Sequence, residues 1–239
     1  PSLFTSSPSL QRFGQVWYQA NFRHFFTNSV VVASMTPIIT IMTTVPAGYT
    51  LSRLNFVGPK GTSLLLSLIQ MLPVFLIFIP STLLVTPLFF VLRSLGLINT
   101  RLGLIICYVT QTFPLAIWML KAFFDKIPHE IDEAALIDGC SEIGALLRVI
   151  LPLNLGSVAV IGIFGFILAW REYLFAMAFT SRISAQTVPI GVSLFIGAHQ
   201  VNYGQLMTTA TIGSIPVLVI FMFIQRFIIE GLAAGAVKG

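Results

Sequence analysis

Charged side chains are scarce in this sequence of 239 residues, in which 13 are Lys or Arg and 8 are Asp or Glu, 9% of the chain together. Soluble domains carry about 25% charged residues. A soluble fold of this size would lack the ionic side chains that its surface needs. With 56% of the residues hydrophobic, the composition excludes an ordinary soluble domain and indicates an integral membrane protein.

Cysteine is almost absent too, because Cys107 and Cys140 are the only two. Two cysteines exclude a disulfide framework and a cysteine-rich metal site, and His199 has no partner at metal-ligand spacing. The sequence also lacks a nucleophile with a neighbouring base, a catalytic carboxylate pair and a GxxxxGK[ST] phosphate loop. We therefore expect no catalytic residues, no metal and no cofactor on this chain. The net charge of +5 comes from singly scattered bases, which suit the flanks of membrane spans and not a nucleic acid.

Five long stretches contain no charged residue, and each can hold one membrane helix because about 20 apolar residues cross the hydrocarbon of a bilayer. These stretches are 24–52, 61–92, 102–120, 149–170 and 183–225. We expect five spans, at about 28–50, 62–84, 102–122, 154–176 and 205–226. Pro80 and Pro87 are expected to break the second helix near its exit.

The spans divide the chain into an extracytoplasmic lead-in at 1–27, a membrane domain at 28–228 and a cytoplasmic tail at 229–239. Seven bases flank the spans on the side of the longest polar connection, 123–153, and five flank them on the other side. Because loops rich in Lys and Arg stay in the cytoplasm, this balance places 123–153 there.

The acids are concentrated in that connection. Six of the eight lie within 18 residues, at Asp125, Glu130, Asp132, Glu133, Asp138 and Glu142. Pro128 suits the first position of a helix, and Gly139 suits a left-handed residue at its end. Ser141 can cap a second helix that Pro152 ends. The local pattern predicts a helix, a glycine turn and a second helix, which either meets a partner or is a solvated hairpin that joins two spans.

The same segment carries a spaced motif: Glu133-Ala134-Ala135, three residues, Gly139, nine residues, then Val149-Ile150-Leu151-Pro152. It resembles the EAA loop of bacterial ABC importer permeases, with Val149 where that family has Ile. From about residue 21 to 239 the chain is similar to permeases for carbohydrate uptake, such as the smaller membrane subunit of the maltose transporter. The supporting segments are Asn28-Ser29, Ala47-Gly48-Tyr49, Ala134 to Gly139, Ala169-Trp170 and Gly235 to Gly239.

The resemblance implies an all-helical permease of the inner membrane, with six spans of which the first is missing from this sequence. It also implies that the EAA helix docks on an ATPase subunit. The partners would be a second permease, two ATPase subunits that bind ATP and Mg, an extracytoplasmic solute-binding protein and membrane lipid. The residues implied in coupling are Glu133, Ala134, Ala135, Asp138, Gly139 and Pro152. The two alanines allow close packing, Gly139 makes the turn, and Glu133 can meet a basic group.

Two segments on the outer side are candidates for the solute path or for contact with the binding protein. Arg171, Glu172 and Tyr173 adjoin the fourth span; Arg171 departs from the family's Trp-Asn-Glu, and an arginine there can instead snorkel to the interface. In the loop 179–206, Gln200, Asn202 and Tyr203 suit sugar contacts or an ordinary interfacial loop. The tail offers Lys238 as a contact toward the ATPases. Gln70, Gln111 and Gln225 are expected to form hydrogen bonds between helices.

The resemblance points to ATP-driven import of a sugar or sugar-like solute. Within that class the alternative cargo is a phosphorylated polyol or another polar solute. An ion-coupled secondary transporter is a further alternative, but it expects ionisable residues inside the spans, and the expected spans carry none in their interiors.

Overall fold

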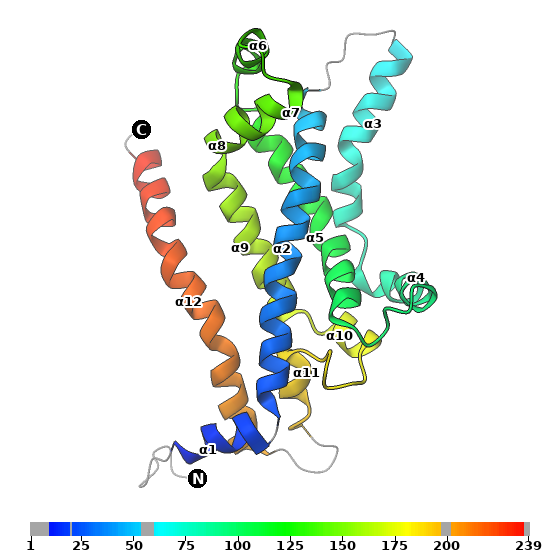
Figure 1. Cartoon of the computed structure of the whole chain (residues 1–239), viewed down its shortest axis with the longest axis vertical. Coiled ribbons are helices and arrows are strands. Elements are labelled where there is room, and N and C mark those ends of the chain that lie inside the picture. Colours follow the sequence, from blue (N-terminus) through cyan, green and yellow to red (C-terminus); the bar gives the residue numbers. More distant parts are fainter. Residues whose placement is uncertain (1–9, 20, 54–59, 197–201, 237–239) are drawn as a thin grey trace.

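The computed structural model describes residues 10–19, 21–53, 60–196 and 202–236, with side chains for 10–18, 21–53, 67–196 and 202–222. Every element in these ranges is a helix (Figure 1). The elements are α1 (Gln11–Gly14), η1 (Gln15–Gln19), α2 (Phe22–Arg53), α3 (Lys60–Ile77), α4 (Ser81–Ser94), α5 (Arg101–Phe124), α6 (His129–Ile137), α7 (Glu142–Ala145), η2 (Leu146–Ile150), α8 (Leu151–Leu153), α9 (Leu155–Arg171), α10 (Leu174–Phe179), α11 (Val188–Ser193) and α12 (Tyr203–Ala236). The predicted all-helical class is confirmed.

Helix α2 forms the axis of the fold and packs on α5 and α9 (Figure 1). Gly48 allows α2 and α5 to lie close together, because a Cβ atom at this position would lie 2.9 Å from the Cβ of Leu120. The hydroxyls of Thr40 and Thr112 join the same two helices at 2.9 Å. A hydroxyl pair of this kind satisfies polar groups where lipid and protein offer no water.

Three helices are long and apolar enough to cross a membrane: Phe22–Arg53, Arg101–Phe124 and the stretch Tyr203–Met222 of α12. Two pairs of helices pass the same test only as bent pairs, so the described residues hold up to five candidate spans. Each of the five predicted spans overlaps one of these three helices or one of the two bent pairs, and the multi-pass architecture is confirmed.

The second predicted span ends earlier than expected. Helix α3 stops at Ile77, and α4 begins at Ser81 after a bend of 99°. Pro80 precedes α4 with an extended backbone, so the break predicted at Pro80 is confirmed, whereas the break predicted at Pro87 was wrong because Pro87 lies inside α4. The packing of α4 fixes its direction, since Leu92 is buried and the rings of Phe89 and Phe179 lie 6.5 Å apart.

The fourth predicted span is also interrupted. Helix α9 ends at Arg171, the backbone of Glu172 is extended, and α10 begins at Leu174. The prediction of one helix from 154 to 176 was therefore wrong at its outer end. The carboxylate of Glu172 accepts hydrogen bonds from the backbone N–H groups of Phe175 and Ala176, and these bonds stabilise the start of α10.

The two ends of the bundle carry different elements. The short helices α6, α7 and α8 lie at the end where α2 and α5 finish, and α1, α10 and α11 lie toward the other end (Figure 1). At that other end Asn28 donates hydrogen bonds to the carbonyls of Ile183 and Gln186 and accepts one from Arg101 at 2.8 Å. These bonds attach the connection between α10 and α11 to the start of α2.

Candidate functional site

The acidic segment folds as a helical hairpin, defined here as residues 129–145, at one end of the bundle. Helix α6 ends in a glycine turn: Gly139 has φ of +87°, the N–H of Cys140 reaches the carbonyl of Ala135, and the N–H of Gly139 reaches that of Leu136. This pair of bonds is a Schellman motif. The hydroxyl of Ser141 then accepts a hydrogen bond from the N–H of Gly144 at 3.1 Å. The predicted left-handed glycine and serine cap are both confirmed.

Helix α6 has an inner and an outer face. Asp132 and Ala135 are buried against the rest of the chain, whereas Glu133 and Ala134 are exposed. Asp138 and Gly139 at the turn are exposed as well, and Pro152 lies exposed in α8, beyond the hairpin. The six residues expected to couple to a partner are thus brought to one end of the fold, with Ala135 turned inward.

The hairpin also shows an apolar outer surface that sequence reasoning did not identify. Ile137 is 86% exposed, Leu136 and Ile143 of the hairpin are exposed as well, and so is Leu147 just after it. Apolar side chains next to carboxylates on one surface are typical of protein–protein contact sites. The sequence signal was present, because these residues interrupt an otherwise polar connection.

A buried ion pair attaches the hairpin to the axis helix. Asp132 lies 2.7 Å from Nη2 of Arg53 at the end of α2, and these side chains are 11% and 13% exposed. The hydroxyl of Tyr49 donates a hydrogen bond of 2.5 Å to the other carboxylate oxygen. Arg53 also donates to the backbone carbonyl of Phe124, the last residue of α5, at 3.2 Å. One cluster, Tyr49–Arg53–Asp132, therefore connects α2, α5 and α6.

Sequence reasoning missed this cluster. Arg53 appeared as a flanking base and Asp132 as one acid of a solvated face, and 78 residues separate them. No local spacing rule pairs residues so far apart, since only the packing of α6 on α2 brings them together.

A polar groove of about 390 Å³ opens beside the cluster. Its lining combines the cluster with the carboxylates of Glu133 and Glu142, and the full set is Tyr49, Thr50, Arg53, His129, Asp132, Glu133, Leu136 and Glu142. Because the charge of Asp132 is already balanced by Arg53, the two glutamates leave the groove with negative charge. A basic group of a partner would find a complementary site here.

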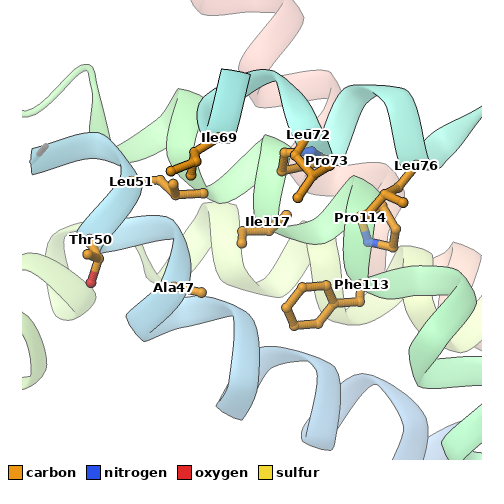
Figure 2. Close-up of a pocket in the computed structure, with 10 residues that line it drawn as sticks. All are labelled: Ala47, Thr50, Leu51, Ile69, Leu72, Pro73, Leu76, Phe113, Pro114 and Ile117. Atoms are coloured by element: carbon orange, nitrogen blue, oxygen red, sulfur yellow. The ribbon is translucent and has the colours of Figure 1, made fainter. Parts of the chain in front are cut away.

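A second cavity, of about 460 Å³, is apolar. Its ten lining residues come from α2, α3 and α5, as Figure 2 shows, and only Thr50 brings a polar side chain. Such a lining offers almost no hydrogen-bonding groups, so it suits lipid or another helix and does not suit a polar solute.

The outer candidates lie in different elements. Arg171 ends α9, Glu172 is buried at the turn, and Tyr173 is 40% exposed just before α10. At the start of α12, the side chain of Asn202 accepts a hydrogen bond from the N–H of Gln205, and Tyr203 is exposed. Gln200 and Lys238 fall outside the described residues.

The outer part of α9 contacts α12 through one side chain. The indole N–H of Trp170 donates to the carbonyl of Gly213 at 3.0 Å. Two of the predicted interhelical amides are confirmed as well: Gln70 donates to the carbonyl of Leu51, and Gln111 donates to the hydroxyl of Ser81.

Comparison with known proteins identifies a family whose model matches most of this chain. A model of the family described as "Binding-protein-dependent transport system inner membrane component" matches residues 44–233, a range that contains the whole hairpin.

Two curated relatives are permease proteins. The chain is 35% identical over 236 residues to the sulfoquinovosyl glycerol transport system permease protein SmoH of Agrobacterium fabrum, with 99% of this chain and 80% of the relative covered. It is 36% identical over 220 residues to the trehalose/maltose transport system permease protein MalG of Thermococcus litoralis, with 92% and 77% covered.

Among solved structures, the chain is similar to part of a bacterial ABC transporter involved in the import of the acidic polysaccharide alginate. The TM-score is 0.75 at 20% identity, over 90% of this chain and 78% of that one. At this identity the likeness shows a shared fold.

Proposed function

The chain belongs to the family of binding-protein-dependent transport system inner membrane components, and on this basis we propose that it is the permease subunit of an ATP-driven importer of a sugar or sugar-like solute. It is a multi-pass protein of the inner membrane and a transport subunit, not an enzyme. The relatives named for sulfoquinovosyl glycerol and for trehalose and maltose support a sugar-like cargo.

The observation that carries the coupling role is the two-sided hairpin. Its inner face is held to α2 and α5 by the Tyr49–Arg53–Asp132 cluster. Its outer face exposes Glu133 and Ala134 beside the apolar surface. A short helix attached rigidly to the membrane helices on one side, and open to a partner on the other, transmits a displacement between the two. We infer that an ATPase subunit docks on this outer face.

The partners that we propose rest on the family to which the chain belongs, together with this arrangement of the hairpin. ATP and Mg are held by two ATPase subunits, since this chain has no GxxxxGK[ST] loop. A second permease completes the path across the membrane. On the opposite side an extracytoplasmic binding protein delivers the solute, and the segment with Gln200, Asn202 and Tyr203 is its proposed contact. Lys238 in the tail is a proposed contact on the ATPase side.

The test of the coupling role is substitution in the hairpin of the assembled transporter in proteoliposomes. Glu133→Lys replaces a groove carboxylate by a cation, and Gly139→Pro cannot adopt φ of +87°. A charge-assisted contact contributes about 1.5–3 kcal/mol, so we expect docking to weaken by about ten- to hundredfold in Glu133→Lys. Uptake per ATP hydrolysed should fall in both variants while membrane insertion stays normal.

The matched control is Glu130→Lys, which makes the same charge change on the same helix at an exposed residue that does not line the groove. It should retain most of the uptake. Unchanged uptake and unchanged co-purification of an ATPase subunit in Glu133→Lys and Gly139→Pro would contradict the coupling role.

A further inference from the structure

A cavity of about 370 Å³, with both apolar and polar lining residues, lies between α3, α4, α5 and α9. Apolar residues form most of its wall, and the polar side chains are those of Ser81, Thr110, Gln111 and Arg171. Arg171 is the only charged residue among the described residues that line it.

The cavity extends from Gln111, near the middle of α5, to Arg171, the last residue of α9. Gln111 immediately precedes Thr112, and the hydroxyl of Thr112 meets that of Thr40, close to the midpoint of α2. An arginine that snorkels would extend toward the aqueous interface beyond the end of its helix. Arg171 is exposed at the end of α9, yet it lines the same cavity as Gln111, so its cation is available to a ligand in that cavity.

The charge of Arg171 is not neutralised by the neighbouring acid. Both carboxylate oxygens of Glu172 accept hydrogen bonds from backbone N–H groups of Phe175 and Ala176. Among the described residues, the ion pairs are Arg53–Asp132 and Lys121–Asp125, and neither involves Arg171. An ionisable side chain that lines a cavity between membrane helices typically marks a path for a ligand or an ion.

The neighbouring groups add hydrogen-bonding capacity. The amide of Gln111 donates to the oxygen of Ser81 at 2.8 Å, which leaves the Ser81 proton free to donate into the cavity. The guanidinium of Arg171 supplies several more donors in a planar fork that matches carboxylate, sulfonate and phosphate groups. The cavity wall therefore offers one cation and several hydrogen-bond donors. An oxyanion is the ligand that can pair with the cation and accept these hydrogen bonds.

We propose that this cavity binds the anionic group of a solute during its passage, so that the cargo is an acidic or phosphorylated sugar-like molecule and Arg171 is a specificity-determining residue. The proposal rests on the transport function proposed above and narrows its substrate class to anionic solutes.

The first test measures the sign of the potential in the cavity. In the assembled transporter carrying Cys107→Ala and Cys140→Ala, Thr110→Cys places a thiol on the cavity wall. Its rate of reaction is measured with two methanethiosulfonates, one with a sulfonate group and one with a trimethylammonium group. Each rate is normalised to the reaction with free 2-mercaptoethanol.

We expect the normalised rate to favour the sulfonate by at least about tenfold, at the lower end of the rate effects that a focused charge produces. The preference should disappear in Arg171→Gln and persist in Arg171→Lys, which retains the charge. A thiol that reacts with neither reagent, or a preference that Arg171→Gln does not change, would overturn the proposal.

The second test identifies the anion by protection of the same thiol. Glucose, glucuronate, glucose 6-phosphate and inorganic phosphate are each added to the labelling reaction. Protection by glucuronate or glucose 6-phosphate that exceeds protection by glucose and by inorganic phosphate supports a sugar-borne anion. Equal protection by glucose and glucuronate, or by inorganic phosphate alone, contradicts it.

These tests are independent of the coupling experiment. If the importer function fails, the assembled complex shows no ATP-driven uptake in any variant, although the labelling rates still report the charge of the cavity. If only the anion proposal fails, ATP-driven uptake remains and Arg171→Gln leaves both the labelling ratio and the uptake unchanged.

Discussion

The ion pair between Arg53 and Asp132 should determine how firmly the hairpin is held. Asp132→Asn removes the negative charge and leaves the cation of Arg53 buried without its partner. Breaking a buried ion pair in this way costs about 3–5 kcal/mol. Because the two side chains keep 13% and 11% exposure, we expect the lower value, about 3 kcal/mol. At about 1.4 kcal/mol per factor of ten, this loss raises the opening constant of the hairpin about a hundredfold.

Hydrogen exchange measures that opening directly. In the assembled transporter, the backbone amides of α6 and of residues 138–145 should lose about a hundredfold of protection in Asp132→Asn, while the middle of α2 keeps its protection. Uptake per ATP hydrolysed should fall in the same variant, because a loosely attached helix transmits less displacement to α2.

Two comparisons make the experiment specific. The double variant Arg53→Met with Asp132→Asn removes the unpaired cation and should recover part of the protection. Lys121→Met breaks the pair that Lys121 forms with Asp125 at 2.7 Å at the same end of the fold. The Asp125 side chain is 40% exposed, and solvent screening limits the energy of such a pair to less than about 0.5 kcal/mol. Lys121→Met should therefore leave the protection of the hairpin close to that of the wild type. Wild-type protection in Asp132→Asn would refute the reasoning.

Three further predictions concern packing and capping. Ser141→Ala removes the cap to Gly144 and should lower the stability of α7 by about 1 kcal/mol, seen as faster hydrogen exchange at 142–145. Gly48→Ala places a Cβ 2.9 Å from that of Leu120 and should lower the melting temperature of the purified transporter, because overpacking costs about 1–3 kcal/mol; Gly156→Ala, where nothing lies within 4 Å, should not lower it. Trp170→Phe deletes the indole donor to Gly213 and should destabilise the contact between α9 and α12 by about 1 kcal/mol, measured by the same melting experiment.

Much of the fold was predictable because charge and apolar length are local properties. The charge-free stretches located five membrane segments, and Pro80 marked a real break. The direction after the break was not predictable, since a proline ends a helix without fixing where the chain turns. Contacts of α4 with α10 decide that direction, and they join residues about 90 positions apart, such as Phe89 and Phe179.

The end of α9 was missed for a related reason. Residues 154–176 contain no proline to signal a break, and the charges of Arg171 and Glu172 at the turn do not by themselves end a helix. The carboxylate of Glu172 stabilises this turn, because it accepts hydrogen bonds from the backbone N–H groups of Phe175 and Ala176 near the start of α10. A carboxylate that caps a helix and one that lines a path are alike in the sequence, and only the hydrogen bonds distinguish them.

By itself the sequence determined the membrane class, the hairpin with its glycine turn and serine cap, and the surface where six acids gather, because each depends on composition or on residues within a few turns of one another. The tertiary structure alone decided which acid of that cluster is held inward by Arg53 and which remains exposed. It also decided that Arg171, at the end of α9, lines a cavity between α3, α4, α5 and α9. The physical reason is that charge pairing and burial depend on distances in space, and the pairing of Arg53 with Asp132 forms only when α6 packs on the end of α2.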